Sequence, residues 1–190
     1  REEAWVWEHM ALTRARGIAG APEVCAETEA VRADTIATRR APAAVWDELA
    51  RMRARLATAK PPAGPLDVKP GPGGLQDIEL FAQAAALLSQ SPARATAAQL
   101  QAAARAGLAS RDVADMLARA YRAALAVQSP GRLVLDGPLT AERLGTGAAG
   151  VILQSADAPD LDTLSGRLTE ARTEAARAID AAIAAGRATA

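Results

Sequence analysis

Apolar side chains recur every three or four residues along most of this sequence, and this spacing is the strongest constraint on its fold. The clearest stretch lies near the end, with apolar positions at Leu161, Leu164, Leu168, Ala171, Ala175, Ile179 and Ala182. Another stretch begins after a glycine pair, with Leu75, Ile78, Phe81, Ala82, Ala85 and Leu88 on one side. Such spacing places the apolar groups on one helix face, so the sequence predicts amphipathic helices that pack together.

The small size of the apolar side chains supports the same fold class. Half of the residues are hydrophobic but only 3% are aromatic, so the core must consist of Leu, Val, Ile and a great deal of Ala. Alanine has the highest helix propensity and lets helices approach closely, which favours a bundle. A chain of 190 residues can bury such a core without a metal ion or a disulfide.

Prolines and glycines mark the expected ends of the helices. We expect the first helix to end near Gly17, and further helices at residues 22–38, from 42, from 75, 95–106, 110–128, from 140 into the 150s, and 160–185. Residues 132–136 could form a short extended segment, and residues 145–150 could interrupt a helix, because three glycines fall there.

The most pronounced break is the proline- and glycine-rich segment at residues 60–74, which cannot be helical. The longest run within it that is free of both residue types is residues 66–69, which could form one short extended piece. The predicted fold is therefore an all-α helical bundle with one short extended, glycine-rich insertion. We divide the chain into residues 1–91, which contain the insertion, and residues 92–190, a helical bundle.

The charge balance and the scarcity of cysteine exclude several classes of function. Basic and acidic residues both number 22, so no net field would attract nucleic acid or an anionic membrane. One cysteine and one histidine exclude an internal disulfide and a Cys/His zinc site, and they favour a cytoplasmic location. No apolar run approaches the roughly 18 residues of a membrane span. Because the chain has no initiator methionine, we expect it to be part of a longer protein.

The glycine-rich insertion is the part of the sequence most suggestive of chemistry. Lys69 precedes the pair Gly73 and Gly74, and the helical turn that follows carries Asp77 and Glu79. Glycines let the backbone approach a ligand, and free N–H groups at a helix start favour phosphate. The carboxylates would repel phosphate unless a divalent cation lay between them, so the pattern favours metal plus phosphate over phosphate alone. The alternative of a plain connector stays open, since acids stabilise any first helical turn by about 0.3–1 kcal/mol.

Two longer motifs are also present. Residues 1–16 read REEAWVWEHMALTRAR, and residues 67–79 read DVKPGPGGLQDIE. Together they resemble two signatures of the bifunctional glutamine synthetase adenylyltransferase and deadenylase family, in the expected order and at the expected separation. Leu80 stands where the family usually has phenylalanine, and Phe81 follows it. The resemblance covers about the first 90 residues, and the remainder matches only as an alanine-rich helical region.

This resemblance implies a helical region that follows a polymerase-β-like nucleotidyltransferase core, with residues 1–91 as the end of the nucleotidyltransferase region. The implied reaction is transfer of AMP from ATP to a tyrosine of glutamine synthetase in nitrogen regulation, with Mg²⁺ ions clamping the reacting oxygens. Glutamine synthetase, the PII signal protein and ATP are the implied partners. The metal ligands are expected in an Asp-x-Asp motif ahead of residue 1, so we expect this chain alone to lack that motif and to be inactive.

The resemblance also implies roles for individual residues. The candidate catalytic acids are Asp67, Asp77 and Glu79. The candidate nucleotide- or phosphate-binding residues are Arg16, Lys69, Gly73 and Gly74. An aspartate at position 77 and a chain that stops soon after its last helix favour the adenylylating half of such an enzyme over the deadenylylating half.

Two other interpretations remain open. The helices could form a non-catalytic module that receives glutamine synthetase or PII without touching nucleotide. The chain could also be a fragment related to PII uridylyltransferase, which shares the theme of a lysine, a glycine pair and Asp-Ile. The second alternative fits less well, because the tryptophan-rich opening belongs to the adenylyltransferase family.

Overall fold

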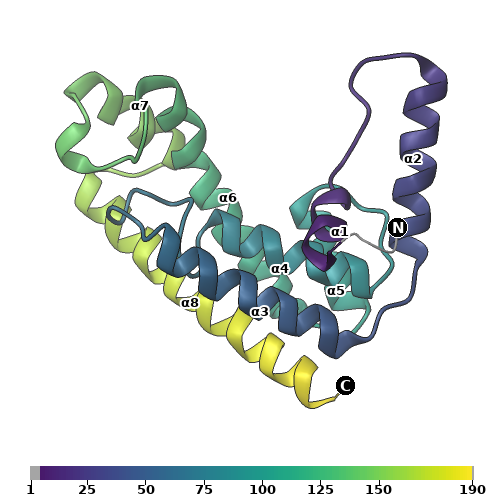
Figure 1. Cartoon of the computed structure of the whole chain (residues 1–190). Helices are drawn as coiled ribbons and strands as arrows, with labels where there is room; N and C mark the ends of the chain where they lie inside the picture. The colour runs from purple at the N-terminus through teal and green to yellow at the C-terminus, as the bar shows by residue number, and fades with distance from the viewer. Residues whose placement is uncertain (1–4, 190) are drawn as a thin grey trace. The chain divides into compact units, whose positions relative to one another are not determined.

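The computed structural model describes residues 5–189, and every regular element within them is a helix (Figure 1). In chain order the elements are α1 (Val6–Leu12), α2 (Pro22–Ala37), α3 (Pro42–Ala59), α4 (Leu75–Leu88), α5 (Thr96–Arg105), α6 (Arg111–Val134), the 3-10 helix η1 (Ala141–Arg143), α7 (Thr146–Ala156) and α8 (Leu161–Ala188). The predicted all-α fold is confirmed. In this described part, no helix has the length and apolar character needed to cross a bilayer.

Some predicted helix limits were wrong. The first helix ends at Leu12 and not near Gly17: the Thr13 carbonyl, which a further helical turn would need as an acceptor, instead accepts from the Arg32 guanidinium. The segment 132–136 is not extended: α6 continues past its proline, and the Leu135 N–H still donates to the carbonyl of Gly131 at 3.0 Å.

The glycines at 145–150 were expected to interrupt a helix, and this prediction was right only at its first glycine: the chain is non-helical at residues 144–145, between η1 and α7. Gly145 is the N-cap residue of α7, and the two glycines that follow lie inside that helix. The insertion contains no strand in its described residues. Its backbone turns sharply, with the Val68 N–H donating to the Leu66 carbonyl at 3.0 Å, so the insertion is a compact loop.

The chain separates into two compact units, each built from segments far apart in sequence. Unit 1 contains the segments up to Met52, from Glu79 to Asp115, and from Ala181 onward, and unit 2 contains Arg53–Ile78 and Met116–Asp180. The boundaries between them fall inside α3, α4, α6 and α8. Both units draw on residues 1–91 and 92–190, and the division at residue 91 stays a prediction.

The core of unit 1 is centred on an aromatic pair. Trp46 of α3 and Phe81 of α4 stack with ring centroids 5.9 Å apart, and both are buried. Arg32 of α2 is also buried, at 2% exposure, and its guanidinium donates to the carbonyls of Thr13 and Pro92. This arginine therefore ties α2 to the loop after α1 and to the loop after α4.

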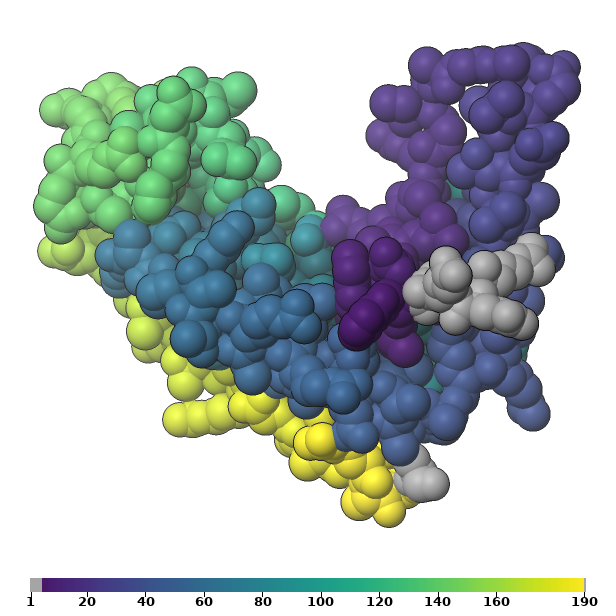
Figure 2. All heavy atoms as spheres, viewed as in Figure 1, coloured from purple at the N-terminus to yellow at the C-terminus, as the bar shows by residue number. Residues whose placement is uncertain are grey.

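One part of unit 1 is much less covered than the rest. Figure 2 shows the loop after α1 and the first half of α2 projecting from the remainder of the unit, in purple. The exposed fractions agree: they are 84% for Ile18, 59% for Val24 and 46% for Val31. These three apolar side chains face solvent and contribute little to the core.

The core of unit 2 incorporates the glycine-rich loop. Leu66, Val68 and Leu75 from the loop and the start of α4 are buried in one apolar cluster. The other buried members of the cluster are Ala124, Val127, Leu139, Ile152, Leu164 and Leu168, from α6, α7, α8 and the loop before η1. The loop is thus part of the hydrophobic core of unit 2, and its backbone position is set by buried side chains on both sides of Lys69.

The loop also lies directly against the backbone of α8. Gly73 has φ +68°, and a Cβ atom at this position would lie 1.9 Å from the carbonyl oxygen of Arg172. The Arg172 guanidinium donates to the carbonyls of Asp67 at 3.3 Å and Pro70 at 2.9 Å. A side chain at position 73 would therefore push the loop off the helix that holds it.

We expect Gly73→Ala to lower the free energy of unfolding by about 2–4 kcal/mol, because alanine disfavours this φ and its methyl group would collide with backbone. Gly64→Ala is the matched control in the same loop, since nothing lies within 4 Å of its Cβ position. The control should change stability by less than about 0.5 kcal/mol. Urea unfolding followed by circular dichroism measures both. Equal stability of the two variants would contradict the close approach of loop and helix.

A second prediction concerns the tryptophan in unit 1. A Cβ atom on Gly186 of α8 would lie 2.2 Å from Nε1 of Trp46, which is 1% exposed and cannot move aside freely. Gly186→Ala should therefore destabilise the protein by about 1–3 kcal/mol. Gly166→Ala, in an open position on the same helix, should stabilise it by about 0.5–1 kcal/mol. Opposite signs in urea unfolding are the expected result, and a stabilising Gly186→Ala would be inconsistent with this packing.

Candidate functional site

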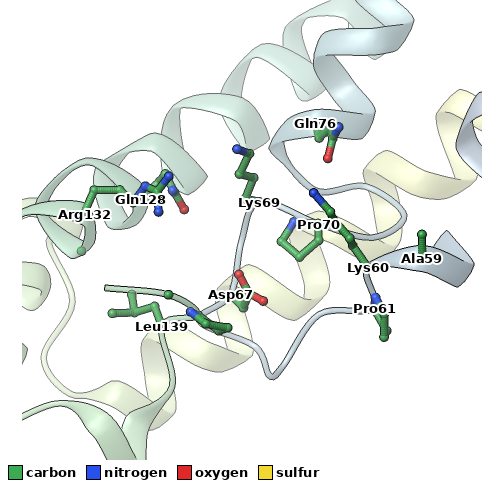
Figure 3. Close-up of a pocket in the computed structure, with 13 residues that line it drawn as sticks. Ala59, Lys60, Pro61, Asp67, Lys69, Pro70, Gln76, Gln128, Arg132 and Leu139 are labelled. Carbon is green, nitrogen blue, oxygen red and sulfur yellow. The ribbon is translucent and has the colours of Figure 1, made fainter. Parts of the chain in front are cut away.

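A pocket of about 560 Å³ lies entirely within unit 2 and contains the lysine of the glycine-rich loop. Figure 3 shows the elements that line it: the end of α3, the loop, the first turn of α4, the last turns of α6 and the segment that follows α6. The lining residues are Ala59, Lys60, Pro61, Asp67, Lys69, Pro70, Gln76, Gln128, Gly131, Arg132, Gly137, Pro138 and Leu139. The volume is in the range of small-molecule sites in proteins.

The pocket has an excess of positive charge. The sequence has twenty arginines but only two lysines, and both lysines, Lys60 and Lys69, line this pocket together with Arg132. The side chains of these three cations form no hydrogen bond or ion pair with any described residue. Asp67 is the one carboxylate in the lining, and its Oδ2 accepts a hydrogen bond from the Ala63 N–H at 3.1 Å. The surroundings therefore favour an anionic ligand.

Two carboxamides complete the polar lining. Gln76 comes from α4, and Gln128 lies one helical turn before Arg132 on α6, so both α6 side chains reach the same side of the pocket (Figure 3). A carboxamide can donate to phosphate oxygens or accept from a ligand hydroxyl or amine. The pocket thus combines positive charge, which favours an anionic ligand, with two neutral carboxamides that could fix the orientation of that ligand.

Four backbone N–H groups before and in the first turn of α4 are not free to bind an anion, because each has an acceptor within the chain. The pairs are Gly73 to the Asp77 carboxylate at 2.7 Å, Gly74 to the Gly71 carbonyl at 3.1 Å, Leu75 to the Val68 carbonyl at 2.9 Å and Gln76 to the Lys69 carbonyl at 3.2 Å. The phosphate-binding role of Gly73 and Gly74 stays a prediction, and in the structure both glycines shape the loop.

Asp77 is held in a buried network of hydrogen bonds. Its carboxylate accepts from Arg53 Nε at 2.5 Å and Nη2 at 3.0 Å, in addition to the Gly73 N–H. Burial alone would lower the pKa of Arg53, but Asp77 and Asp180 outweigh that effect and raise this pKa. The bidentate pair fastens the loop and α4 to α3. The catalytic role of Asp77 stays a prediction.

The other candidate residues are divided between the two units. Asp67 and Lys69 line the pocket of unit 2, as described above. Glu79 belongs to unit 1, where its carboxylate pairs with Arg14 at 2.8 Å. Arg16 also belongs to unit 1 and is exposed beyond the end of α1. Asp67, Lys69 and the two loop glycines are therefore close together, whereas the roles of Glu79 and Arg16 remain predictions.

Sequence reasoning missed three residues of this region: Lys60, Arg132 and Arg172. Lys60 could have been found, because it is the only lysine besides Lys69 and stands at the other end of the loop sequence. Arg132 was expected in an extended segment, so the sequence did not predict that Arg132 and Gln128 lie on one face of a helix. Nothing in the sequence indicated that Arg172, a hundred residues later, would hold the loop.

The described residues do not fit a resident metal ion. Among residues 5–189, no three His, Cys, Asp or Glu side chains gather closely enough to hold one. The expectation that this chain lacks an Asp-x-Asp pattern was wrong for the sequence, since one occurs at Asp160 and Asp162, but it lies at the start of α8 and not on a strand. There Asp160 Oδ1 accepts from the Thr163 N–H at 2.7 Å, and this bond lowers the pKa of Asp160. The pattern is a helix cap.

A family model and several curated proteins match this chain. A family model described as GlnD PII-uridylyltransferase matches residues 43–130, which include the glycine-rich loop. A protein of Mesorhizobium japonicum named bifunctional glutamine synthetase adenylyltransferase/adenylyl-removing enzyme is 37% identical, over 98% of this chain and 19% of that protein. Proteins of the same name from Rhodopseudomonas palustris and Agrobacterium fabrum are 35% and 34% identical, over 90% and 88% of this chain and 18% of each relative.

The similarity extends well past the two motifs of the first 90 residues. It reaches the later helices, which supply Arg132 and Arg172. The chain spans about one fifth of the length of the curated relatives it matches. It therefore belongs to the family of the bifunctional glutamine synthetase adenylyltransferase/adenylyl-removing enzymes.

Proposed function

We propose that this chain works as part of a longer adenylyltransferase, which transfers AMP from ATP to a tyrosine of glutamine synthetase in nitrogen regulation. The observation that carries this proposal is the 37% identity, over nearly the whole chain, to a relative named for this activity. The relatives' name includes removal of the adenylyl group as well. Of the two directions, we propose addition.

This chain contributes to the reaction a positively charged side chain, that of Lys69, on a backbone that is held in place. Lys69 stands between carbonyls that Arg172 binds, those of Asp67 and Pro70, and next to the buried Val68. Its backbone is therefore fixed while its ammonium group remains free to contact a ligand. A lysine ammonium is a compact charge that can stabilise the negative charge of transferring phosphates, which supports a role as a phosphate contact.

The Mg²⁺ ions of the proposed reaction would be held elsewhere in the longer enzyme. Asp77 and Asp160 are engaged in ion pairing and helix capping, and no three His, Cys, Asp or Glu side chains gather as a ligand set among the described residues. Mg²⁺ would supply charge neutralisation at the reacting phosphate. This chain would orient the polyphosphate and shield it from water, and PII would act as a regulatory partner of the complete enzyme.

A second candidate is a non-catalytic module that receives glutamine synthetase or PII. The exposed apolar side chains of the α2 region, Ile18, Val24 and Val31, favour this alternative. The family-model match to PII-uridylyltransferase over residues 43–130 supports a relation to that enzyme, the third candidate. The first proposal requires a chemical contribution from Lys69, and the second does not.

The chain by itself should transfer no AMP to glutamine synthetase. The reason is that a ligand set for Mg²⁺ is missing from its described residues, so the α-phosphate of ATP would not be activated. The measurement is incorporation of label from ATP, labelled in its α-phosphate, into glutamine synthetase. The complete enzyme serves as the positive control. Incorporation by this chain above the blank would overturn the expectation.

In the complete enzyme, Lys69→Gln should lower kcat/KM for AMP transfer by about 100- to 1,000-fold, the range for losing one group that stabilises the charge of a transition state. Arg122→Gln is the matched control, because it removes one exposed positive charge of unit 2 that does not line the pocket. It should leave kcat/KM within about twofold of the parent enzyme.

Asp77→Asn is a less specific variant, since it also leaves the buried Arg53 without its carboxylate and should cost about 1–3 kcal/mol of stability. Full turnover in Lys69→Gln would favour the interaction module over the catalytic role.

A further inference from the structure

We propose that the pocket of unit 2 binds a polyphosphate group, with Lys60, Lys69 and Arg132 as its charged ligands. The inference rests on the proposed function for the source of that group, which would be the nucleotide substrate. It goes further in assigning two residues outside the sequence motifs, one on each side of the loop lysine. It also names the class of ligand that the pocket accepts.

The three cations come from three separate elements: the end of α3, the loop and the last turns of α6 (Figure 3). Unit 2 also contains Arg53, which faces two carboxylates, whereas the three pocket cations have no ionic partner among the described residues. Other exposed arginines also lack a partner, but these three border one concavity. An anion that enters the pocket would relieve the repulsion among them.

The positions of the three cations suit an extended anion. In Figure 3, Lys69 lies between Arg132 on one side and Lys60 on the other. A group that contacts all three must extend across the pocket, as two or three linked phosphates do. The pocket volume of about 560 Å³ is ample for such a group. With three cations and one carboxylate, Asp67, the lining has a net charge that suits a multiply charged ligand.

Side chains must supply most of the contacts to the phosphate groups. The N–H groups of residues 73–76 already donate within the chain, so these four cannot cradle phosphate as the backbone does in a glycine-rich phosphate loop. Lysine ammonium groups bind phosphate oxygens without a fixed planar geometry, and arginine adds a bidentate contact. The carboxamides of Gln76 and Gln128 can donate further hydrogen bonds.

The wall of the pocket is already fixed in position before any ligand binds. Leu139 belongs to both the pocket lining and the buried core, and Arg172 holds the loop backbone on either side of Lys69. Only the ends of three long side chains would have to become ordered when a ligand binds. The entropic cost of binding is therefore limited to these side chains.

The test is isothermal titration calorimetry of this chain with pyrophosphate, inorganic phosphate and adenosine. Pyrophosphate should bind more tightly than inorganic phosphate, and adenosine should not bind. Lys60→Gln, Lys69→Gln and Arg132→Gln should each weaken pyrophosphate binding by about fivefold or more, as expected for loss of one charge-assisted contact. Lys69→Arg should retain most of the affinity, and Arg122→Gln should change it by less than about twofold.

Because the three cations are exposed, their variants should keep the circular dichroism spectrum and urea midpoint of the parent chain. Absence of pyrophosphate binding at millimolar concentration would overturn the inference. So would an equal loss of affinity in Arg122→Gln, which would indicate unspecific attraction, or binding of adenosine as tight as that of pyrophosphate.

The inference and the proposed function fail in different ways. AMP transfer by the complete enzyme, combined with no pyrophosphate binding by this chain, would reject the inference alone. Pyrophosphate binding with the expected response to the variants, combined with a complete enzyme that transfers no AMP, would reject the proposed function alone.

Discussion

The contact between the glycine-rich loop and the backbone of α8 is the constraint on which the rest of unit 2 depends. Gly73 lies so close to the carbonyl of Arg172 that no side chain fits between them, and the Arg172 guanidinium binds two loop carbonyls in return. Because the loop is fixed there, its leucine and valine side chains enter the core. This loop cannot form a helix, because it is rich in proline and glycine, but these contacts fix its backbone in place.

Much of the fold could be predicted from the sequence, since helical periodicity and proline or glycine breaks are local signals. Pro22 and Leu75 both begin helices where expected, and the long last helix was found to within a few residues. The errors came from interactions between distant residues or from tolerated exceptions. The Thr13 carbonyl at the end of α1 accepts from Arg32, nineteen residues later, and Pro130 is accommodated inside α6, although proline usually ends a helix.

The candidate site was only partly predictable, for a related reason. The motif 67–79 identified the loop and Lys69, but it could not show that Asp77 pairs with Arg53 or that the N–H groups of α4 are occupied. Those features depend on the contact of helices that are far apart in sequence. The structure therefore shifts the argument for phosphate binding from backbone donors to side-chain cations, which come from both the motif region and the alanine-rich remainder.

The scarcity of lysine in an otherwise arginine-rich chain has a practical consequence. Apart from the terminal amine, the only primary amines of this chain are those of Lys60 and Lys69, and both border the same pocket. Among side chains, reagents that acylate or reductively methylate amines would consequently label these two lysines and leave the twenty guanidinium groups untouched. The amino-acid composition itself thus gives this protein two built-in, chemically selective reporters of whatever occupies the pocket.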